Sequence, residues 1–420
     1  MKPRPASKNG PTELFQPPAR LAADFRRYVC QTSAHPIGIV VESARGAQVR
    51  DRSGRRYLDF VSGLGVNALG HSHPAAVRAI RAQIARYLHV MVYGEFVQEP
   101  QVRLARLLAR IAPVPLSVTY FTNRGTEAVE VALKVAKKYT GRRRLVAFQN
   151  SYHGDTHGAL SVTGRAVYRR PFEPLLPDVT FLPFGAADAL GAIDRRTAAV
   201  ITEPIQGEGG VRVPPDDFLP ALRRRCRAVG ALLIVDEVLT GFGRTDRMFG
   251  FEHSGIVPDI VVMAKALGGG MPLGGFLMPP RIARVLAVDP PLSHVTTFGG
   301  HPVSCAAGAA ALEWLQAKDL PARAARLGDY FIDQLNKISE DINLKSKVII
   351  DVRGRGLLIG LELATPALAR RFVGRCRRAG LLLGWTLHSN TLIRLAPPLT
   401  ITRAELDAGL AIMAASLAAR

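Results

Sequence analysis

The runs AAVITE (198–203), ALLIVD (231–236) and IVVMAK (260–265) are short apolar stretches, and each ends in one charged residue. Such runs are typical of strands that are buried on both faces of a parallel sheet. The terminal charges lie 33 and 29 residues apart, close to one strand–helix–strand unit. Ligands of open α/β sheets bind outside the carboxyl ends of the strands. We therefore expect Glu203, Asp236 and Lys265 to meet at one rim of the sheet, although each alone could simply turn to solvent.

The same pattern extends through the middle of the chain. Further apolar runs lie at 118–121, 145–148 and 179–182, and helical stretches at 125–139 and 217–229 separate several of the runs. This alternation predicts an α/β fold with a mostly parallel central sheet in a large domain, over residues 75–309. Residues 1–20 are expected to form a flexible tail.

Both ends of the chain contribute to a second unit. Residues 40–62 alternate like a β-hairpin or meander. After residue 310 we expect a helix, a strand at 347–352, a helix near 366–379 and strands near 381–395. The sequence therefore predicts a smaller α+β domain, which segment 310–420 forms together with the N-terminal segment 21–74.

Composition narrows the class of protein. Hydrophobic residues make up 48% and charged residues 21% of the 420 residues, which indicates a folded globular chain. No transmembrane or signal segment is expected. The four cysteines form no CxxC pair, which argues against zinc and against a disulfide framework and favours a cytoplasmic location. The net charge of +21 could indicate nucleic-acid binding, but arginine runs without interleaved aromatic residues favour a solvated surface.

Lys265 is the strongest single candidate for catalysis. It lies between a buried strand and the turn Gly268-Gly269-Gly270, so burial should lower its pKa and favour the neutral amine that forms Schiff bases. Asp236 could hold a proton on a pyridine ring nitrogen, as pyridoxal 5'-phosphate (PLP) requires. The glycine stretches at 241–246 and 354–360 lack the spacing of a nicotinamide site.

A phosphate site could lie where segment 120–138 passes from strand to helix. The residues NRGT (123–126) stand at the expected helix start, where free backbone amides and the helix dipole bind anions. An ordinary capped helix terminus explains the same residues equally well. Tyr152, just after the run 145–148, could provide an aromatic surface for a cofactor ring.

Together these motifs resemble the class III (ω-amino) aminotransferases, which are PLP enzymes of fold type I. The resemblance covers roughly residues 38–415, and its most specific stretches are ITEPIQGEGG, LLIVDEVLTGFGRT and PDIVVMAKALGGGMPLGG, in the family's order and spacing. The stretches FTNRGTEAVEVALK, NSYHGDTHGALSVTG and HVTTFGGHPVSCAAG are also similar to family motifs.

The resemblance implies roles for the cofactor-binding residues. Lys265 would form the internal aldimine with PLP, and Asp236 would pair with the pyridine nitrogen. Gly125 and Thr126 would hold the phosphate, and Tyr152 would stack on the ring. Glu203 belongs to the same cofactor-binding group.

The resemblance also implies a homodimer with shared active sites, because Thr297 would reach the phosphate of the neighbouring subunit. Arg394 would bind a substrate carboxylate, and Glu208 would pair with Arg394 when the substrate lacks one. Tyr93 and Glu95 would line the substrate pocket.

Four positions depart from the family pattern. Arg124 replaces a small residue and could either approach the phosphate or point to solvent. Leu239 replaces a glutamine found in some members. Asp155 replaces the arginine of acetylornithine-type members. Leu64 falls near the sequence position at which ornithine-type members have a tyrosine. The last two departures weaken an acetylornithine or ornithine assignment.

The predicted reaction is ping-pong transamination from an ω-amine or amino acid to a keto acid, with 2-oxoglutarate expected as the acceptor. Two alternatives are a PLP-dependent aminomutase on the same scaffold and a non-enzymatic basic binding protein. The sequence does not identify the amino donor.

Overall fold

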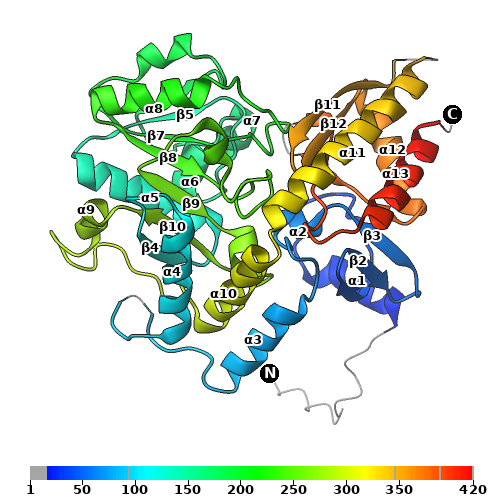
Figure 1. The fold of residues 1–420 in the computed structure, drawn as a ribbon, viewed down its shortest axis with the longest axis horizontal. Helices are drawn as coiled ribbons and strands as arrows, with labels where there is room; N and C mark the ends of the chain where they lie inside the picture. Colours follow the sequence, from blue (N-terminus) through cyan, green and yellow to red (C-terminus); the bar gives the residue numbers. More distant parts are fainter. Residues whose placement is uncertain (1–16, 93, 345–346, 387–388, 419–420) are drawn as a thin grey trace, which may run out of the picture.

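The large sheet lies at the centre of one half of the molecule (Figure 1). The computed structural model describes residues 17–418, apart from 93, 345–346, 387–388 and the side chain of Trp385. The sheet has seven strands in the order β4-β10-β9-β8-β7-β5-β6. Their bounds are β4 (Val118–Thr122), β5 (Arg144–Phe148), β6 (Val179–Leu182), β7 (Thr197–Thr202), β8 (Leu232–Asp236), β9 (Ile260–Met263) and β10 (Gly274–Met278).

Only β10 runs antiparallel to its neighbours, so the prediction of a mostly parallel sheet is confirmed. The sequence analysis did not identify β10, because its run GGFLM begins with two glycines, which weaken a strand pattern. The structure needs those glycines. A Cβ on Gly274 would lie 2.3 Å from the Arg124 carbonyl oxygen, and one on Gly275 would lie 2.8 Å from that of Tyr120.

The strands are apolar on both faces because each face is covered. In β8, Leu232 and Ile234 join one apolar cluster, whereas Leu233 and Val235 join another. Successive strand residues point to opposite faces, so one run supplies both clusters. Helix α5 (Gly125–Thr140) packs in the first cluster and α8 (Phe218–Val229) in the second.

The smaller half contains two four-stranded sheets. One has the order β1-β2-β3-β13, with β1 (Val41–Arg45), β2 (Gln48–Asp51), β3 (Arg56–Asp59) and β13 (Leu381–Leu382). The other has the order β11-β12-β15-β14, with β11 (Ile349–Arg355), β12 (Leu358–Leu363), β15 (Ser389–Leu395) and β14 (Gly384–Thr386). Because β13 pairs in parallel with β3, the N- and C-terminal segments share a sheet, as predicted.

Long helices cover these sheets and connect the halves (Figure 1). They are α1 (Pro18–Tyr28), α3 (Pro74–Ile84), α4 (Glu99–Ile111), α10 (Pro302–Ala317), α11 (Leu320–Asn343), α12 (Pro366–Arg378) and α13 (Arg403–Ala418). The short helices are α2 (Ser62–Gly65), α6 (His157–Ser161), α7 (Ala166–Arg169), α9 (Pro280–Ala283), η2 (Arg170–Phe172), η3 (Asp188–Ala192), η4 (Gly250–Ser254), η5 (Lys265–Gly268) and η6 (Arg284–Leu286).

Three expected boundaries fall inside helices, and the one between residues 74 and 75 lies at the first residue of α3. Residues 18–20 begin α1, whereas residues 1–16 of the expected tail lie outside the described residues. The boundary between 309 and 310 lies within α10, which packs against α3 and α4 of the large half. We therefore propose that the small domain begins between α10 and α11.

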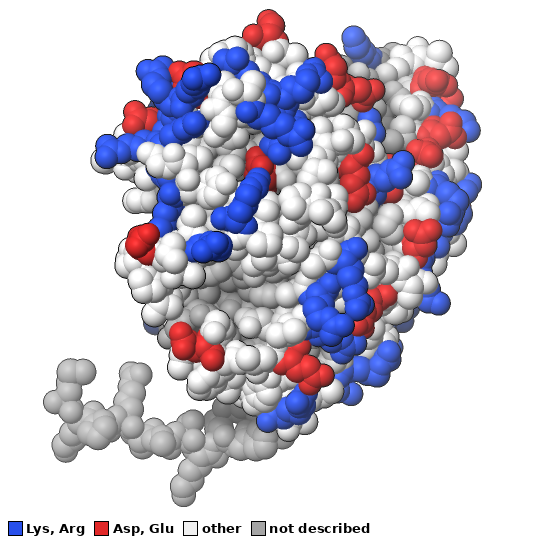
Figure 2. Space-filling model, turned by 60° about the vertical axis from the view of Figure 1, so that its left-hand side comes forward, with Lys and Arg blue, Asp and Glu red and all other residues white. Residues whose placement is uncertain are grey.

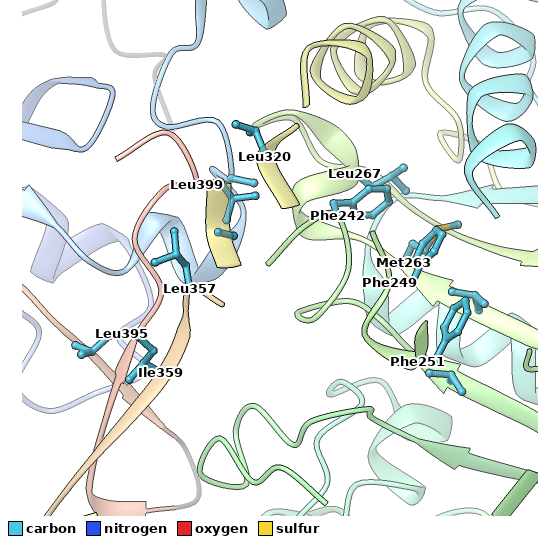
Figure 3. Packing of buried hydrophobic residues seen from close by; sticks show 14 of the residues in the cluster. Phe242, Phe249, Phe251, Met263, Leu267, Leu320, Leu357, Ile359, Leu395 and Leu399 are labelled. Carbon is cyan, nitrogen blue, oxygen red and sulfur yellow. The ribbon is translucent and has the colours of Figure 1, made fainter. Parts of the chain in front are cut away.

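One apolar cluster joins the two halves. From the large half it includes Phe242, Phe249, Phe251, Met263 and Leu267, and from the small half Leu320, Leu357, Ile359, Leu395 and Leu399 (Figure 3). Separating the halves would expose these side chains to water, which costs about 25 cal/mol for each Å² of apolar surface. The cluster therefore fixes the two halves against each other beside the sheet rim.

The surface carries its positive charge in several separate groups, with Asp and Glu among them on the face in Figure 2. Within the described part of the chain, no helix could cross a membrane, and no group of three or more His, Cys, Asp or Glu could hold a metal ion.

Candidate active site

A cavity of about 760 Å³ lies at the carboxyl ends of the central strands. The parallel strands β7, β8 and β9 end beside it, and Glu203, Asp236 and Lys265 all line it. The sequence analysis expected these three residues to meet, and the structure brings them together. The other polar or charged side chains that line the cavity come from Asn123, Arg124, Thr126, Tyr152, His153, Asp155, Thr156, Glu208 and Thr240.

Lys265 follows β9 and begins the short helix η5. Its backbone is left-handed, with φ of 47°, a conformation that a non-glycine residue adopts at a cost. The pKa of Lys265 is lowered to about 8, mainly by burial and also by the nearby Arg394 guanidinium, while the carboxylates of Glu208, Asp236 and Glu203 oppose this shift. A substantial fraction of the amine is therefore neutral near physiological pH, as the sequence analysis expected.

Asp236 is buried and held by two contacts. Its Oδ1 accepts a hydrogen bond from the Val238 amide at 3.0 Å, and its Oδ2 lies 2.7 Å from His153 Nδ1. Sequence analysis missed His153, whose only signal was its place beside Tyr152 in NSYHGDTHG. The buried Nε2 of His153 has no hydrogen-bond partner among the described residues. His153 thus fixes the orientation of the Asp236 carboxylate.

Glu203 ties two cavity segments together. Its carboxylate accepts hydrogen bonds from the Tyr152 amide at 3.2 Å and the Gly207 amide at 3.0 Å. The pKa of Glu203 is raised to about 7, mainly by burial. His153 opposes this rise, and the Asp236 carboxylate adds to it. Glu203 therefore positions Tyr152 and the turn that leads to Glu208.

The start of α5 forms one wall of the cavity. The N-cap residue Arg124 makes no side-chain capping bond, and its side chain is 72% exposed and lies 3.8 Å from Glu127. Gly125 packs closely, because a Cβ there would lie 3.0 Å from Val238 Cγ2. Thr126 Oγ1 lies 2.8 Å from Thr156 Oγ1. The helix terminus thus offers its amides to an anion, and Arg124 points largely to solvent.

Tyr152 also lines the cavity. Its hydroxyl donates a hydrogen bond to Asp155 Oδ2 at 2.8 Å. Burial raises the pKa of Tyr152, and Asp155 raises it further, so the phenol stays protonated. Asp155 therefore orients the ring that the sequence analysis expected to face a cofactor.

The remaining predicted residues divide into two groups. Arg394, on β15, forms a buried ion pair with Glu208, which lines the cavity. Thr297 is exposed and lies outside the cavity, as does the exposed Glu95. Tyr93 lies outside the described residues.

Comparisons with known proteins show the family to which the chain belongs. A family model described as "Aminotransferase class-III" matches residues 29–417. An acetylornithine aminotransferase of Methanopyrus kandleri is 44% identical, over 92% of this chain and 96% of that protein. A putrescine aminotransferase of Pectobacterium atrosepticum is 41% identical, over 91% of this chain and 82% of that protein.

A solved structure of ornithine aminotransferase from Toxoplasma gondii, with PLP partially occupying its active site, has a TM-score of 0.88. It is 31% identical, and the match covers 96% of this chain and 94% of that one. The fold and the site thus define a PLP-dependent transferase of fold type I. The chain belongs to the class III aminotransferase family, and its reaction is PLP-dependent transamination. The names of these relatives give no support to the two alternative functions, a PLP-dependent aminomutase and a non-enzymatic basic binding protein.

The residues present fit PLP. The donor set is complementary to it: a buried carboxylate at Asp236, a buried lysine amine at Lys265 and an anion-binding helix terminus at Gly125 line one cavity. A Cβ on Gly154 would lie 2.3 Å from Thr126 Oγ1, so this glycine keeps that wall closely packed.

We expect Lys265 to attach PLP, so that its pKa predicts how PLP loading depends on pH. Only the neutral amine attacks the cofactor aldehyde, so the second-order rate of attachment should rise about tenfold per pH unit below pH 8 and level off above it. A lysine at its ordinary value of 10.5 would keep gaining rate beyond pH 9. Stopped-flow absorbance of cofactor-free protein mixed with PLP from pH 6 to 10 measures this. A rate still rising steeply above pH 9 would contradict the lowered pKa.

Proposed function

We propose that this aminotransferase takes the amino group from an amine at the end of a carbon chain and gives it to a keto acid, 2-oxoglutarate being the acceptor of choice. The observation that carries the proposal is the buried ion pair between Arg394 and Glu208 beside Lys265. A guanidinium binds a carboxylate in a bidentate manner. Arg394 can therefore bind the keto acid when Glu208 moves away, and Glu208 neutralises Arg394 when a donor lacks a carboxylate.

The carboxylate of Asp155 supports a donor with a second cationic group. Asp155 lines the cavity, and so does Tyr152, whose hydroxyl donates a hydrogen bond to the Asp155 carboxylate. A carboxylate there repels an α-carboxylate and attracts an ammonium group. We therefore propose a diamine such as putrescine as the preferred donor, which the Pectobacterium relative supports. The Methanopyrus relative supports N-acetylornithine as the second candidate.

Each residue has a defined task in this proposal. Bound PLP supplies an electron sink for the charge that develops on the substrate carbon next to the amine. Lys265 Nζ is the covalent attachment point for the cofactor. As a proton carrier, Nζ would take the proton from the amine-bearing carbon of the donor and return it during the transfer. Its pKa near 8 suits both the acceptance and the return of the proton.

The other residues bind and orient. Asp236, held by His153, would keep a proton on the pyridine nitrogen. The amides at Gly125 and Thr126 would hold the phosphate. Tyr152, fixed by Asp155 and by the Glu203 bond to its amide, would cover one face of the ring.

We further propose a homodimer in which Thr297 of each subunit reaches the phosphate of the other. Support comes from its place on an exposed loop outside its own cavity. Exposed apolar residues lie near Thr297, namely Val295 and Phe298 close to it in sequence and Phe96 and Val97 on the neighbouring loop. A second copy of the chain would cover them. The buried thiols of Cys226, Cys305 and Cys376 are unpaired, which supports a reducing compartment such as the cytoplasm.

The test of the donor is the half-reaction. The PLP-loaded protein is mixed with putrescine, N-acetylornithine, ornithine or 4-aminobutyrate, and the visible absorbance is followed before and after 2-oxoglutarate is added. We expect putrescine to bleach the protein fastest and 2-oxoglutarate to restore the colour. A faster reaction with N-acetylornithine would favour the second candidate, and no bleaching by any amine would refute the proposal.

The ion pair gives a prediction for the acceptor. The double variant Arg394→Ala/Glu208→Gln removes the guanidinium without leaving a buried carboxylate unpaired. We expect the KM for 2-oxoglutarate to rise about tenfold to a hundredfold, because hydrogen bonds to charged groups contribute about 1.5–3 kcal/mol. The rate of the putrescine half-reaction should change less than threefold. Equal losses in both half-reactions would contradict a role specific to the keto acid.

A further inference from the structure

The short helix α2 (Ser62–Gly65) has an unusual backbone. Its four residues are all left-handed, with φ of 50°, 60°, 63° and 82° in chain order. Ser62 and Leu64 carry side chains, so the left-handed backbone is strained at both residues. Such residues persist only where the surrounding structure determines their conformation and they cluster at functional sites.

A chain of three side chains holds this turn. Asp59, buried at the end of β3, accepts hydrogen bonds through Oδ1 from the amides of Val61 at 2.7 Å and Ser62 at 3.2 Å. Its Oδ2 lies 2.7 Å from His71 Nε2. His71 Nδ1 in turn lies 3.2 Å from Asn67 Nδ2. Asp59 thus fixes the turn at the amides of Val61 and Ser62, and His71 fixes it at Asn67.

On one side the turn faces the catalytic lysine. A Cβ on Gly65 would lie 2.8 Å from Leu239 Cδ1 and 4.0 Å from Lys265 Cδ, so the turn approaches both side chains closely. Val66 lines the cavity itself. A small displacement of the turn would therefore change the space around Lys265.

On the other side the flanking residues bind the segment that follows Arg394. The Phe60 carbonyl accepts from the Ala396 amide at 2.8 Å, and the Ala68 carbonyl accepts from the Leu399 amide at 2.8 Å. Thr400 Oγ1 donates to the Leu69 carbonyl at 3.1 Å. The turn thus lies between the lysine and the chain that carries the carboxylate-binding arginine.

We propose that Asp59 and His71 are positioning residues that hold the turn 62–66 as a spacer between Lys265 and Arg394, and so set which keto acids fit between them. The inference rests on the proposed function, because it assigns Arg394 to the acceptor's carboxylate. Neither residue touches the substrate. Their effect is transmitted through the backbone of the turn and through the bonds to residues 396–400.

The test compares His71→Ala and Asp59→Asn with His73→Ala. His73, two residues after His71, is a matched control, since it caps α3 through the Ala75 amide at 3.3 Å and packs on Trp314 rather than on the turn. Hydrogen exchange of peptides covering residues 60–68 is measured in the PLP-loaded proteins. Steady-state kinetics with 2-oxoglutarate and the shorter oxaloacetate are measured alongside.

We expect both test variants to exchange the amides of the turn at least about tenfold faster, while His73→Ala exchanges them at the wild-type rate. The KM for 2-oxoglutarate should rise about tenfold with kcat changed less than threefold, since a displaced turn would shift the segment that follows Arg394 through its bonds to residues 396–400. The preference for 2-oxoglutarate over oxaloacetate should fall. A merely structural role would lower stability without changing this preference.

Unchanged exchange in the turn would overturn the proposal, because Asp59 and His71 would then not hold it. Faster exchange with an unchanged KM and acceptor preference would overturn it too. Failure of the proposed function would look different, since the double variant Arg394→Ala/Glu208→Gln would then leave the KM for 2-oxoglutarate unchanged. The exchange comparison needs no turnover and would still show whether the two residues fix the turn.

Discussion

The variant Lys265→Ala is expected to lose amino transfer by about four orders of magnitude or more. A positioned proton carrier alone contributes about 10²–10⁴ in rate, and the variant also loses the covalent attachment point. The structure provides no substitute, because Lys265 is the one lysine among the residues that line the described cavity. Purified variant is assayed for turnover with putrescine and 2-oxoglutarate, and by borohydride reduction in the presence of PLP followed by peptide mass spectrometry.

The control is Lys337→Ala, which removes a lysine paired with Asp333 on the exposed face of α11. This variant should keep wild-type turnover and wild-type labelling of the peptide that contains Lys265. Retained turnover in Lys265→Ala, or borohydride labelling at another lysine of the wild type, would refute the assignment.

The variant Asp236→Asn is expected to lower kcat about a hundredfold or more, which corresponds to about 2.7 kcal/mol in the activation free energy. The amide has nearly the shape of the carboxylate but cannot stabilise a proton on a ring nitrogen, so the electron sink weakens. The change should affect kcat in both half-reactions, because both pass through the same charge development. Single-turnover absorbance with putrescine and, separately, with 2-oxoglutarate measures the two rates.

Asp194→Asn is the matched control, since Asp194 pairs with the exposed Arg196 and does not line the cavity. It should retain wild-type rates. If Asp236→Asn kept more than a tenth of the wild-type rate in both half-reactions, Asp236 would not be the partner of the ring nitrogen.

The rim of the sheet could be predicted because its signal is local. Glu203, Asp236 and Lys265 each end an apolar run, and parallel strands place their carboxyl ends together whatever the details of packing. The shared sheet of the two terminal segments could also be anticipated, although its parallel pairing could not.

Other features depend on tertiary contacts that leave little trace in the sequence. His153 and Asp236 are separated by 83 residues, and no periodicity shows that their side chains meet. Helix α10 crosses an expected boundary because it is buried on most sides, so it lacks the polar face that would have defined its limits. The left-handed turn after β3 contains Ser62 and Leu64, residues that local preference would place elsewhere.

The pairing of β3 with β13 has a consequence for synthesis of the chain. Leu58 pairs with Leu381, about 320 residues later. At about 5–20 residues per second, a ribosome needs about 15–65 s between making the two strands. During that time β3 has an uncovered edge, which is a template for pairing with other chains. Yield of soluble protein should therefore depend on what shields the edge of β3 while the ribosome makes the residues up to β13.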